Sequence, residues 1–299
     1  MKRVIFGILI LSLPGMIFGQ SVQETQTDYT GFFGTSYVIE GDNSQFRFDI
    51  LELDIAHKIN DKFSLEGALA VENGQAGVEG ILSMRLWENS SIKIGRFDIP
   101  FGYEFNRYDP HINKFESVSL MNTSLMNGIW NDEGINFSMS FLSFNMNVFV
   151  INGDASHKTG GIRLANNYFE PVEVGVSAAS VLNSNQLDKD IITNVYGRMT
   201  PGDFKIRAEI TSNQEGSSIE GAEEGMGYYI SGLYDMEEKI NLPVYFGTRY
   251  SSVNYDNGGS NCKVSAGLGY KITKTNLIKL FYGTEGDNSN ITFETGVSF

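Results

Sequence analysis

The chain is poor in cysteine, proline, basic side chains and long apolar runs. Its 299 residues include one cysteine, Cys262, and 6 prolines. A lone cysteine cannot close an intramolecular disulfide, and without clustered thiols and imidazoles it cannot complete a structural zinc site. After residue 20 no run reaches the roughly 18 apolar residues that a spanning helix needs, which excludes a helical membrane protein.

The charge balance excludes a second class of protein. There are 22 Lys and Arg against 36 Asp and Glu, for a formal charge of −14. Binding of a phosphate backbone needs clustered basic side chains, so no nucleic-acid partner is expected. A hydrophobic fraction of 41%, with 12% aromatic residues, is too high for a disordered or collagen-like chain. The composition therefore indicates one large folded unit.

The first twenty residues have the pattern of a secretory signal peptide. Two basic residues precede an apolar run over residues 4–17, and small or turn-forming residues follow at Gly19 and Gln20. This run is shorter than the roughly 20 residues of a spanning helix, and an uncleaved anchor is the alternative. We expect residues 1–20 to be a cleaved signal peptide and residues 21–299 to form one exported domain.

Beyond that segment the dominant pattern is alternation at period two, in short runs separated by Gly, Asn, Asp and Ser. The last run, 290–299, has Ile, Phe, Thr, Val and Phe at its odd-numbered positions and polar or small residues at its even-numbered ones. Segments 63–72, 172–182 and 203–213 alternate in the same way. Each predicted strand therefore has one apolar face and one polar face.

The number of segments favours a membrane barrel over a soluble sandwich, which uses about seven to nine strands. We expect strands near residues 28–39, 46–58, 63–72, 77–87, 91–100, 129–141, 143–152, 159–168, 172–182, 190–200, 203–213, 226–236, 242–254, 262–272, 276–284 and 290–299. Aromatic residues gather near the segment ends at Trp87, Tyr168, Phe169, Tyr196, Tyr234, Tyr270, Tyr282 and Phe299. An even strand number and aromatic girdles are typical of outer-membrane barrels. We predict an all-β, transmembrane antiparallel β-barrel of about sixteen strands, or of fourteen or eighteen if one hairpin is misassigned.

The predicted connections alternate between tight turns, including residues 59–62 and 88–90, and mostly longer loops, including residues 41–44 and 285–289. The longest connection, Phe101–Gly128, is the third long loop. Loops of this length usually have a function, and a sixteen-stranded barrel encloses water. We expect this loop to fold into the lumen as a constriction, although an external cap is the alternative. Its predicted gate charges are Glu104, Arg107, Asp109, His111, Lys114 and Glu116.

Residues 92–104, IKIGRFDIPFGYE, resemble the strand that leads into the constriction loop of phosphate-selective porin O/P-like proteins. Residues 131–141, NDEGINFSMSF, resemble the strand that returns from it. This resemblance implies a trimeric sixteen-stranded porin and is weak evidence for the solute. Arg96 breaks the alternation, because Ile92 and Ile94 are expected to face lipid. Either a bulge shifts the register at Arg96 or this residue lies against a neighbouring subunit.

The polar face of each strand assigns charges to the channel wall. The predicted wall cations are Arg85, Lys93, Arg163, Arg198, Lys205, Arg207, Arg249 and Lys279. The predicted wall acids are Glu52, Asp54, Glu66, Glu72, Glu79, Glu173, Glu209 and Glu294. Cations lean toward the later strands and acids toward the early ones, and such opposed rows would set up a transverse field. Pairing between neighbouring strands is the alternative. Acidic outer loops would attract cations, which puts anion selectivity in doubt.

Other chemistries find little support. The three histidines, His57, His111 and His157, have no serine motif beside them, so no enzyme is expected. The acidic turns at 256–259 and 285–288 lack the spacing of a calcium loop, and we expect neither a metal nor a cofactor. The remaining alternative is a non-conducting outer-membrane barrel for surface adhesion or anchoring. Its packed interior would need more bulky inward residues than Phe149, Tyr245 and Phe281.

The sequence therefore predicts a porin in the outer membrane of a Gram-negative-type bacterium. It would form a water-filled passive diffusion channel for small hydrophilic or ionic solutes, surrounded by outer-membrane lipid and assembled as a homotrimer. Phe299 resembles the terminal aromatic residue by which barrel proteins are passed to their assembly machinery, so we expect its loss to impair insertion.

Overall fold

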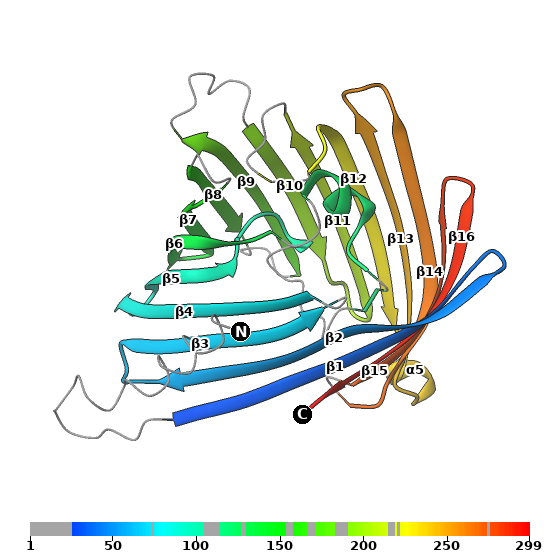
Figure 1. Cartoon of the computed structure of the whole chain (residues 1–299), viewed down its shortest axis with the longest axis horizontal. Helices are drawn as coiled ribbons and strands as arrows, with labels where there is room; N and C mark the ends of the chain where they lie inside the picture. Colours follow the sequence, from blue (N-terminus) through cyan, green and yellow to red (C-terminus); the bar gives the residue numbers. More distant parts are fainter. Residues whose placement is uncertain are drawn as a thin grey trace.

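Sixteen antiparallel strands in chain order form a closed barrel in the computed structural model (Figure 1). The structure describes residues 26–72, 75–104, 114–115, 117–126, 130–153, 158–166, 171–182, 191–214, 219, 222–273 and 276–299. The strands are β1 (Gln26–Glu40), β2 (Asn43–Lys58), β3 (Phe63–Glu72), β4 (Gln75–Trp87), β5 (Ser90–Asp98), β6 (Asn131–Phe141), β7 (Phe144–Ile151), β8 (Lys158–Asn166), β9 (Val172–Leu182), β10 (Ile191–Met199), β11 (Phe204–Asn213), β12 (Gly225–Asp235), β13 (Val244–Tyr255), β14 (Ser260–Lys271), β15 (Leu277–Glu285) and β16 (Asn288–Ser298). Within these ranges there are two short helices, α4 (Leu120–Met126) and α5 (Glu237–Ile240).

The first and last strands close the ring. The β1–β16 pair runs from Phe32 opposite Ser298 to Glu40 opposite Asn290. Phe299 adds two backbone hydrogen bonds with Gly31, of 2.9 and 3.0 Å. Closure provides partners for the backbone N–H and C=O groups of both end strands, which a hydrocarbon environment could not do.

Successive side chains point to opposite sides of the wall. On β11, Ile206 and Ile210 are exposed on the outside, whereas Glu209 is buried on the inside. An apolar exterior with a polar interior suits a barrel surrounded by lipid. Tyr196, predicted for an aromatic girdle, instead points inward and is buried, because it lies on the polar side of β10. Among the described residues, no helix is long and apolar enough to cross a membrane.

The predicted sixteen strands are confirmed, and their bounds differ from the predicted ones by no more than three residues. The predicted contrast in connection length is weaker than expected. Two connections of the longer set, 41–42 and 286–287, are two-residue turns, because Gly41 and Gly286 each adopt a φ of 57°. One connection of the tight set, 236–243, is longer and contains α5. The predicted signal peptide lies outside the described residues, and its cleavage stays a prediction.

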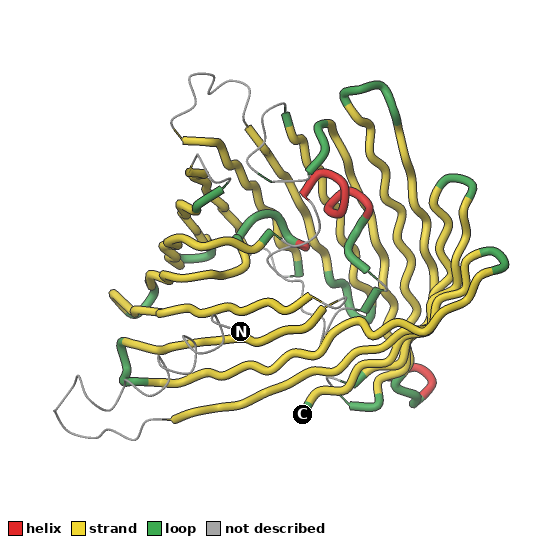
Figure 2. The backbone as a smooth tube through the Cα atoms, viewed as in Figure 1, coloured by secondary structure: helices red, strands yellow, loops and turns green. Residues whose placement is uncertain are grey.

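The described part of the connection between β5 and β6 (residues 99–104, 114–115, 117–126 and 130) folds into the barrel, so the predicted inward loop is confirmed and the external cap is wrong. Helix α4 packs against β11, β12 and β13 (Figures 1 and 2). The backbone N–H of Met121 donates a 3.0 Å hydrogen bond to Oγ of Ser251, which lies on the inner face of β13. One apolar cluster joins the connection to the wall, and it includes Phe101, Leu120, Met121, Leu125, Met126, Trp130, Phe149 and Val253.

No bulge accompanies Arg96. Strand β5 pairs with β4 and β6 without a register shift at this residue, so the bulge alternative is wrong. Arg96 is exposed, and its Nε donates a 2.8 Å hydrogen bond to Oδ1 of Asn131. The irregularity lies one residue earlier, at Gly95, whose φ is 136°. A Cβ on Gly95 would lie 1.9 Å from the carbonyl oxygen of Gly80 on β4.

We therefore expect Gly95→Ala to separate β4 from β5 and to destabilise the barrel by about 2 kcal/mol or more, the usual scale of such backbone strain. Gly80→Ala is the matched control, because a Cβ at Gly80 would meet nothing within 4 Å. The measurement is the temperature at which each folded barrel unfolds in detergent, followed by its heat-modifiable migration in gels. Equal unfolding temperatures for the two variants would refute this account of Gly95.

Candidate channel constriction

The carboxylate of Glu104 joins the start of the inward-folded connection to the region of α4 and to the barrel wall. Its carboxylate accepts hydrogen bonds from the backbone N–H of Ser119, at 3.0 and 3.2 Å, and from Nδ2 of Asn122 at 2.6 Å. It also forms a 2.9 Å ion pair with Nη1 of Arg249 on β13. The Arg249 side chain is 3% exposed and that of Glu104 is 13% exposed, so this pair is almost fully desolvated. Such a pair is stable only when its geometry is good and its remaining polar atoms are bonded.

A second carboxylate, Glu209 on β11, holds the backbone beside Glu104. It accepts hydrogen bonds from the N–H groups of Tyr103 at 3.0 Å and Glu104 at 3.2 Å. The amide of Asn194 on β10 donates to it at 2.7 Å. Glu209 is 1% exposed, so these donors replace the water that its carboxylate would otherwise bind. The wall thus captures the start of the connection through its backbone.

Gly102 makes this close approach possible. Its φ is 60°, and a Cβ there would lie 2.2 Å from Oε1 of Glu209. Its N–H donates to Oγ of Ser177 at 2.9 Å, and its carbonyl oxygen accepts from Nε of Arg163 at 3.0 Å. Arg163 also donates to the hydroxyl of Tyr196 and lies 3.7 Å from the Glu173 carboxylate. Strands β8 and β9 therefore hold one glycine of the connection directly, and Tyr196 on β10 supports Arg163.

Cations of the later strands bind carbonyl oxygens of the same connection farther along. Nη2 of Arg249 donates to the carbonyl of Ser117 at 2.8 Å, and Nζ of Lys279 donates to that of Phe115 at 3.0 Å. The guanidinium of Arg249 also lies 4.7 Å from the centre of the Phe115 ring. The hydroxyl of Tyr245 donates to the carbonyl of Lys114 at 3.2 Å. These contacts fix the connection along the inner face of β13 to β15.

The predicted gate residues are only partly described. Arg107, Asp109, His111 and Glu116 lie outside the described residues, so their gate role stays a prediction. Lys114 lies inside the barrel, with Nζ 3.9 Å from Asp235 and 5.0 Å from the centre of the Tyr245 ring. Glu104, predicted as a gate charge, is an anchor of the connection by its geometry.

The predicted wall cations fall into three sets. Arg163, Arg249 and Lys279 are each 3–4% exposed and hold the connection. Arg198, Lys205 and Arg207 lie on β10 and β11, where Arg198 donates to the Tyr103 hydroxyl at 3.4 Å and the Arg207 guanidinium lies 5.1 Å from the Tyr103 ring centre. Lys93 and Arg85 lie on the opposite wall, where Nζ of Lys93 is 3.9 Å from Glu66. Their effect on solutes stays a prediction.

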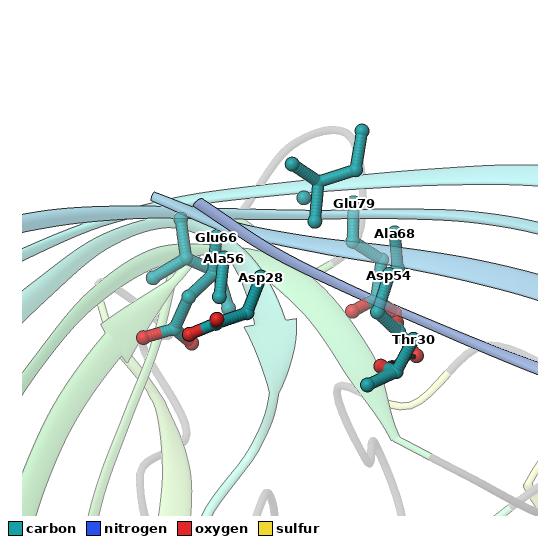
Figure 3. Close-up of a pocket in the computed structure, with 10 residues that line it drawn as sticks. Asp28, Thr30, Asp54, Ala56, Glu66, Ala68 and Glu79 are labelled. Atoms are coloured by element: carbon teal, nitrogen blue, oxygen red, sulfur yellow. Dashed lines mark hydrogen bonds between the residues drawn. The ribbon is translucent and has the colours of Figure 1, made fainter. Parts of the chain in front are cut away.

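The lumen contains a cavity beside that opposite wall. A cavity of 310 Å³ lies against β1 to β4 (Figure 3). Its lining is Asp28, Thr30, Asp54, Ile55, Ala56, Glu66, Gly67, Ala68, Glu79 and Ile81. The small residues among them leave space that the described part of the connection does not fill. The lumen is therefore packed along β8 to β15 and hollow along β1 to β4.

The sequence carries no local signal for the anchoring role of the wall residues that hold the connection. Glu209 and Arg163 were placed on the inner face, which is correct, but nothing local marks their partners. The sequence predicts only an inner-face position for Ser177 and does not distinguish Asn194 or Ser251, because small polar residues are common on the inner face of any such strand. The one local signal was Gly102, a glycine after Pro100 in a stretch that no longer alternates.

We expect Arg249→Met to destabilise the folded barrel by about 3 kcal/mol or more, because it leaves the Glu104 carboxylate buried without its cation. Lys93→Met is the control: its 3.9 Å contact with Glu66 is exposed on both sides, and such pairs contribute about 1 kcal/mol at most. Thermal unfolding in detergent measures both. A smaller loss for Arg249→Met than for Lys93→Met would contradict the anchoring role.

Comparisons with known proteins agree with this architecture. No family model and no curated protein sequence matches the chain. A solved structure of OmpT with loop L8 deleted, an outer membrane protein of Vibrio cholerae, matches with a TM-score of 0.67 at 15% identity, covering 93% of this chain and 100% of that one. An anion-selective porin from Comamonas acidovorans matches with a TM-score of 0.65 at 11% identity, and a triple mutant of the Rhodopseudomonas blastica porin with 0.64 at 8%; each match covers 92% of this chain and 100% of the other. At these identities the likeness shows the fold, which is that of outer-membrane porin barrels.

Proposed function

We propose that the chain is a porin, a water-filled passive diffusion channel for small hydrophilic solutes in an outer membrane. The observation that carries the proposal is the half-filled lumen: the described residues of the connection (99–104, 114–115, 117–126 and 130) lie on one side, and a polar cavity lies on the other. Sixteen strands enclose more space than side chains alone fill. The inward connection narrows that space into a constriction instead of closing it.

The charges around the constriction support a transverse field. Carboxylates line the cavity on β1 to β4, whereas Arg198, Lys205 and Arg207 lie on β10 and β11, half the ring away. Opposed charges across a narrow lumen orient polar solutes during passage. The proposal contains no catalytic step: His57 contacts Oγ1 of Thr27 at 2.7 Å, and the other two histidines lie outside the described residues.

A homotrimer is part of the proposal. Arg96 is exposed on β5, two residues after the exposed Ile94, and its described side-chain contact is with Asn131. A charged side chain at the lipid surface is costly near the middle of a bilayer, by about 2–4 kcal/mol. Contact with a second copy of the chain would remove that cost. The resemblance of residues 92–104 to phosphate-selective porins stays a prediction about family and solute.

One observation favours a non-conducting display barrel as the second candidate. Phe149, Tyr245 and Phe281 are buried in the lumen, as a packed interior would require. All three, however, lie in the half that the connection occupies, where they contact Trp130, Phe115 or the backbone of Lys114. They therefore explain how the connection is held and leave the other half open.

Swelling of liposomes in uncharged sugars tests the proposed channel. Protein reconstituted into liposomes should admit small sugars, and the swelling rate should fall as the sugar becomes larger. A barrel that is folded, as shown by heat-modifiable migration, but admits no sugar would contradict the porin proposal and favour the display barrel.

Deletion of His111–Thr123 should raise the swelling rate for the larger sugars, because it removes Lys114, Phe115 and the first half of α4 from the lumen. The same assay measures it, with the intact chain as reference. The tight turn of residues 286–287, at the same end of the barrel, supplies the control: a short glycine–serine insertion there should leave the rates unchanged. Equal rates for the deletion and the intact chain would contradict the proposal that this connection narrows the lumen.

A further inference from the structure

The open side of the lumen has a regular arrangement of carboxylates. In one row across the strands, Asp28 pairs with Ala56, and Ala56 with Glu66. In the next row inward along the wall, Thr30 pairs with Asp54, Asp54 with Ala68, and Ala68 with Glu79. Acidic and small residues therefore alternate across β1 to β3 in the first row and across β1 to β4 in the second, whereas Glu66 pairs with Ile81 on β4. The four acids Asp28, Asp54, Glu66 and Glu79 are called the carboxylate wall below.

This wall borders open space. All four acids line the 310 Å³ cavity, and no Lys or Arg is among its lining residues. Figure 3 shows the carboxylates of Asp28 and Glu66 lying near each other, and those of Asp54 and Glu79 grouped with Thr30. The alanines between them are too small to shield the carboxylates from the lumen. A solute that passes along this side therefore meets several acids within one short stretch.

Three acids of the wall accept hydrogen bonds from neighbouring side chains. Asp28 accepts from the amide of Gln26 at 3.0 Å, Asp54 from the hydroxyl of Thr30 at 3.4 Å, and Glu79 from the amide of Asn131. These donors are neutral. Glu66 has a cation, Lys93, but their contact is 3.9 Å long and exposed on both sides, so water screens it.

Three buried cations of the later strands are engaged by the connection. Arg163, Arg249 and Lys279 are each 3–4% exposed, and each binds a carbonyl oxygen of the connection as well as an acid of its own. Arg198 lies 3.9 Å from Glu173, and Arg207 lies against the ring of Tyr103. The connection thus neutralises or covers much of the positive charge of the later strands, while the carboxylate wall faces open space.

Negative charge also gathers at the end of the barrel where β1 joins β2 and β13 joins β14, among the described residues. Its exposed acids include Asp42, Glu223, Glu224, Asp256 and Asp287. The chain as a whole has a formal charge of −14. Acids at the mouth raise the local concentration of cations, and acids along the wall lower the barrier to their passage.

From these observations we infer that the channel selects for cations, both inorganic ions and small solutes with an ammonium group, and that the carboxylate wall determines this selectivity. The inference rests on the proposed porin function and names its solute class. It assigns the decisive charges to β1 to β4, outside the inward connection.

Reversal potentials of the full-length protein in planar bilayers test the inference, with a potassium chloride gradient across the membrane. The intact channel should be permeable to potassium over chloride. The double variant Asp28→Asn, Asp54→Asn should lower that permeability ratio by about threefold, the scale expected for loss of two unit charges across a screened, water-filled lumen. Both substitutions keep the size of the side chain, and Glu66→Gln is a second, single variant that should change the ratio in the same direction.

Asp61→Asn is the matched control. Asp61 lies in the β2–β3 turn, 2.7 Å from Lys58, and the hydrogen bond from Lys58 keeps the pKa of its carboxyl below the ordinary value. The substitution removes the same charge outside the cavity, so the permeability ratio should not change. A chloride-selective channel, or equal ratios for all variants, would overturn the inference while the porin proposal stands. A folded barrel that never conducts would overturn both.

Discussion

A β-sheet in hydrocarbon cannot leave an edge unpaired, and this constraint shapes the rest of the molecule. Closure of β16 on β1 removes both edges, but a ring of sixteen strands is too wide for its own side chains to fill. The barrel therefore needs additional structure if its lumen is to be narrowed. The connection between β5 and β6 provides it. The side of the barrel to which that connection binds determines which half of the lumen is packed and which charges remain exposed.

The connection is bound by polar groups because the lumen offers a polar face. Outward apolar side chains alternate with inward polar ones along each strand, and this alternation places Glu209, Arg163 and Arg249 on the inner wall. Placed there without partners they would be costly to bury. The backbone of residues 102–104 and the carboxylate of Glu104 supply those partners, and the aromatic clusters around Trp130 and Phe115 exclude water from the contacts. Anchoring on one side leaves the other side hollow, and the asymmetry of charge follows from that asymmetry of packing.

Much of the barrel could be predicted from the sequence because its signals are local. Alternation at period two and clusters of Gly, Asn and Asp mark each strand within its own run, as for residues 290–299, and counting the runs yields the strand number. The lengths of the turns were predicted less well, since the tightness of the hairpins at Gly41 and Gly286 depends on a positive φ that glycine permits but does not impose. The inner or outer face of Arg249, Lys279 and Glu209 also followed from alternation.

The anchoring contacts could not be predicted, because they join residues far apart in the chain. Tyr103 and Glu209 are separated by 106 positions, and Glu104 and Arg249 by 145. Alternation places each residue on the inner face, but it carries no information about which part of the wall the connection will contact. For the same reason the sequence indicates an almost neutral wall, whereas the structure covers the cations of one side and leaves the acids of the other facing open space.

The most direct test of this account is the accessibility of the two sides of the lumen. In a Cys262→Ser background, which removes the one exposed thiol, Ala68→Cys would report on the hollow side and Ser251→Cys on the side covered by α4. The measurement is the rate at which a charged, water-soluble thiol reagent modifies each cysteine in the folded barrel. The account predicts rapid modification at position 68 and strong protection at position 251. Equal rates at the two positions would contradict it.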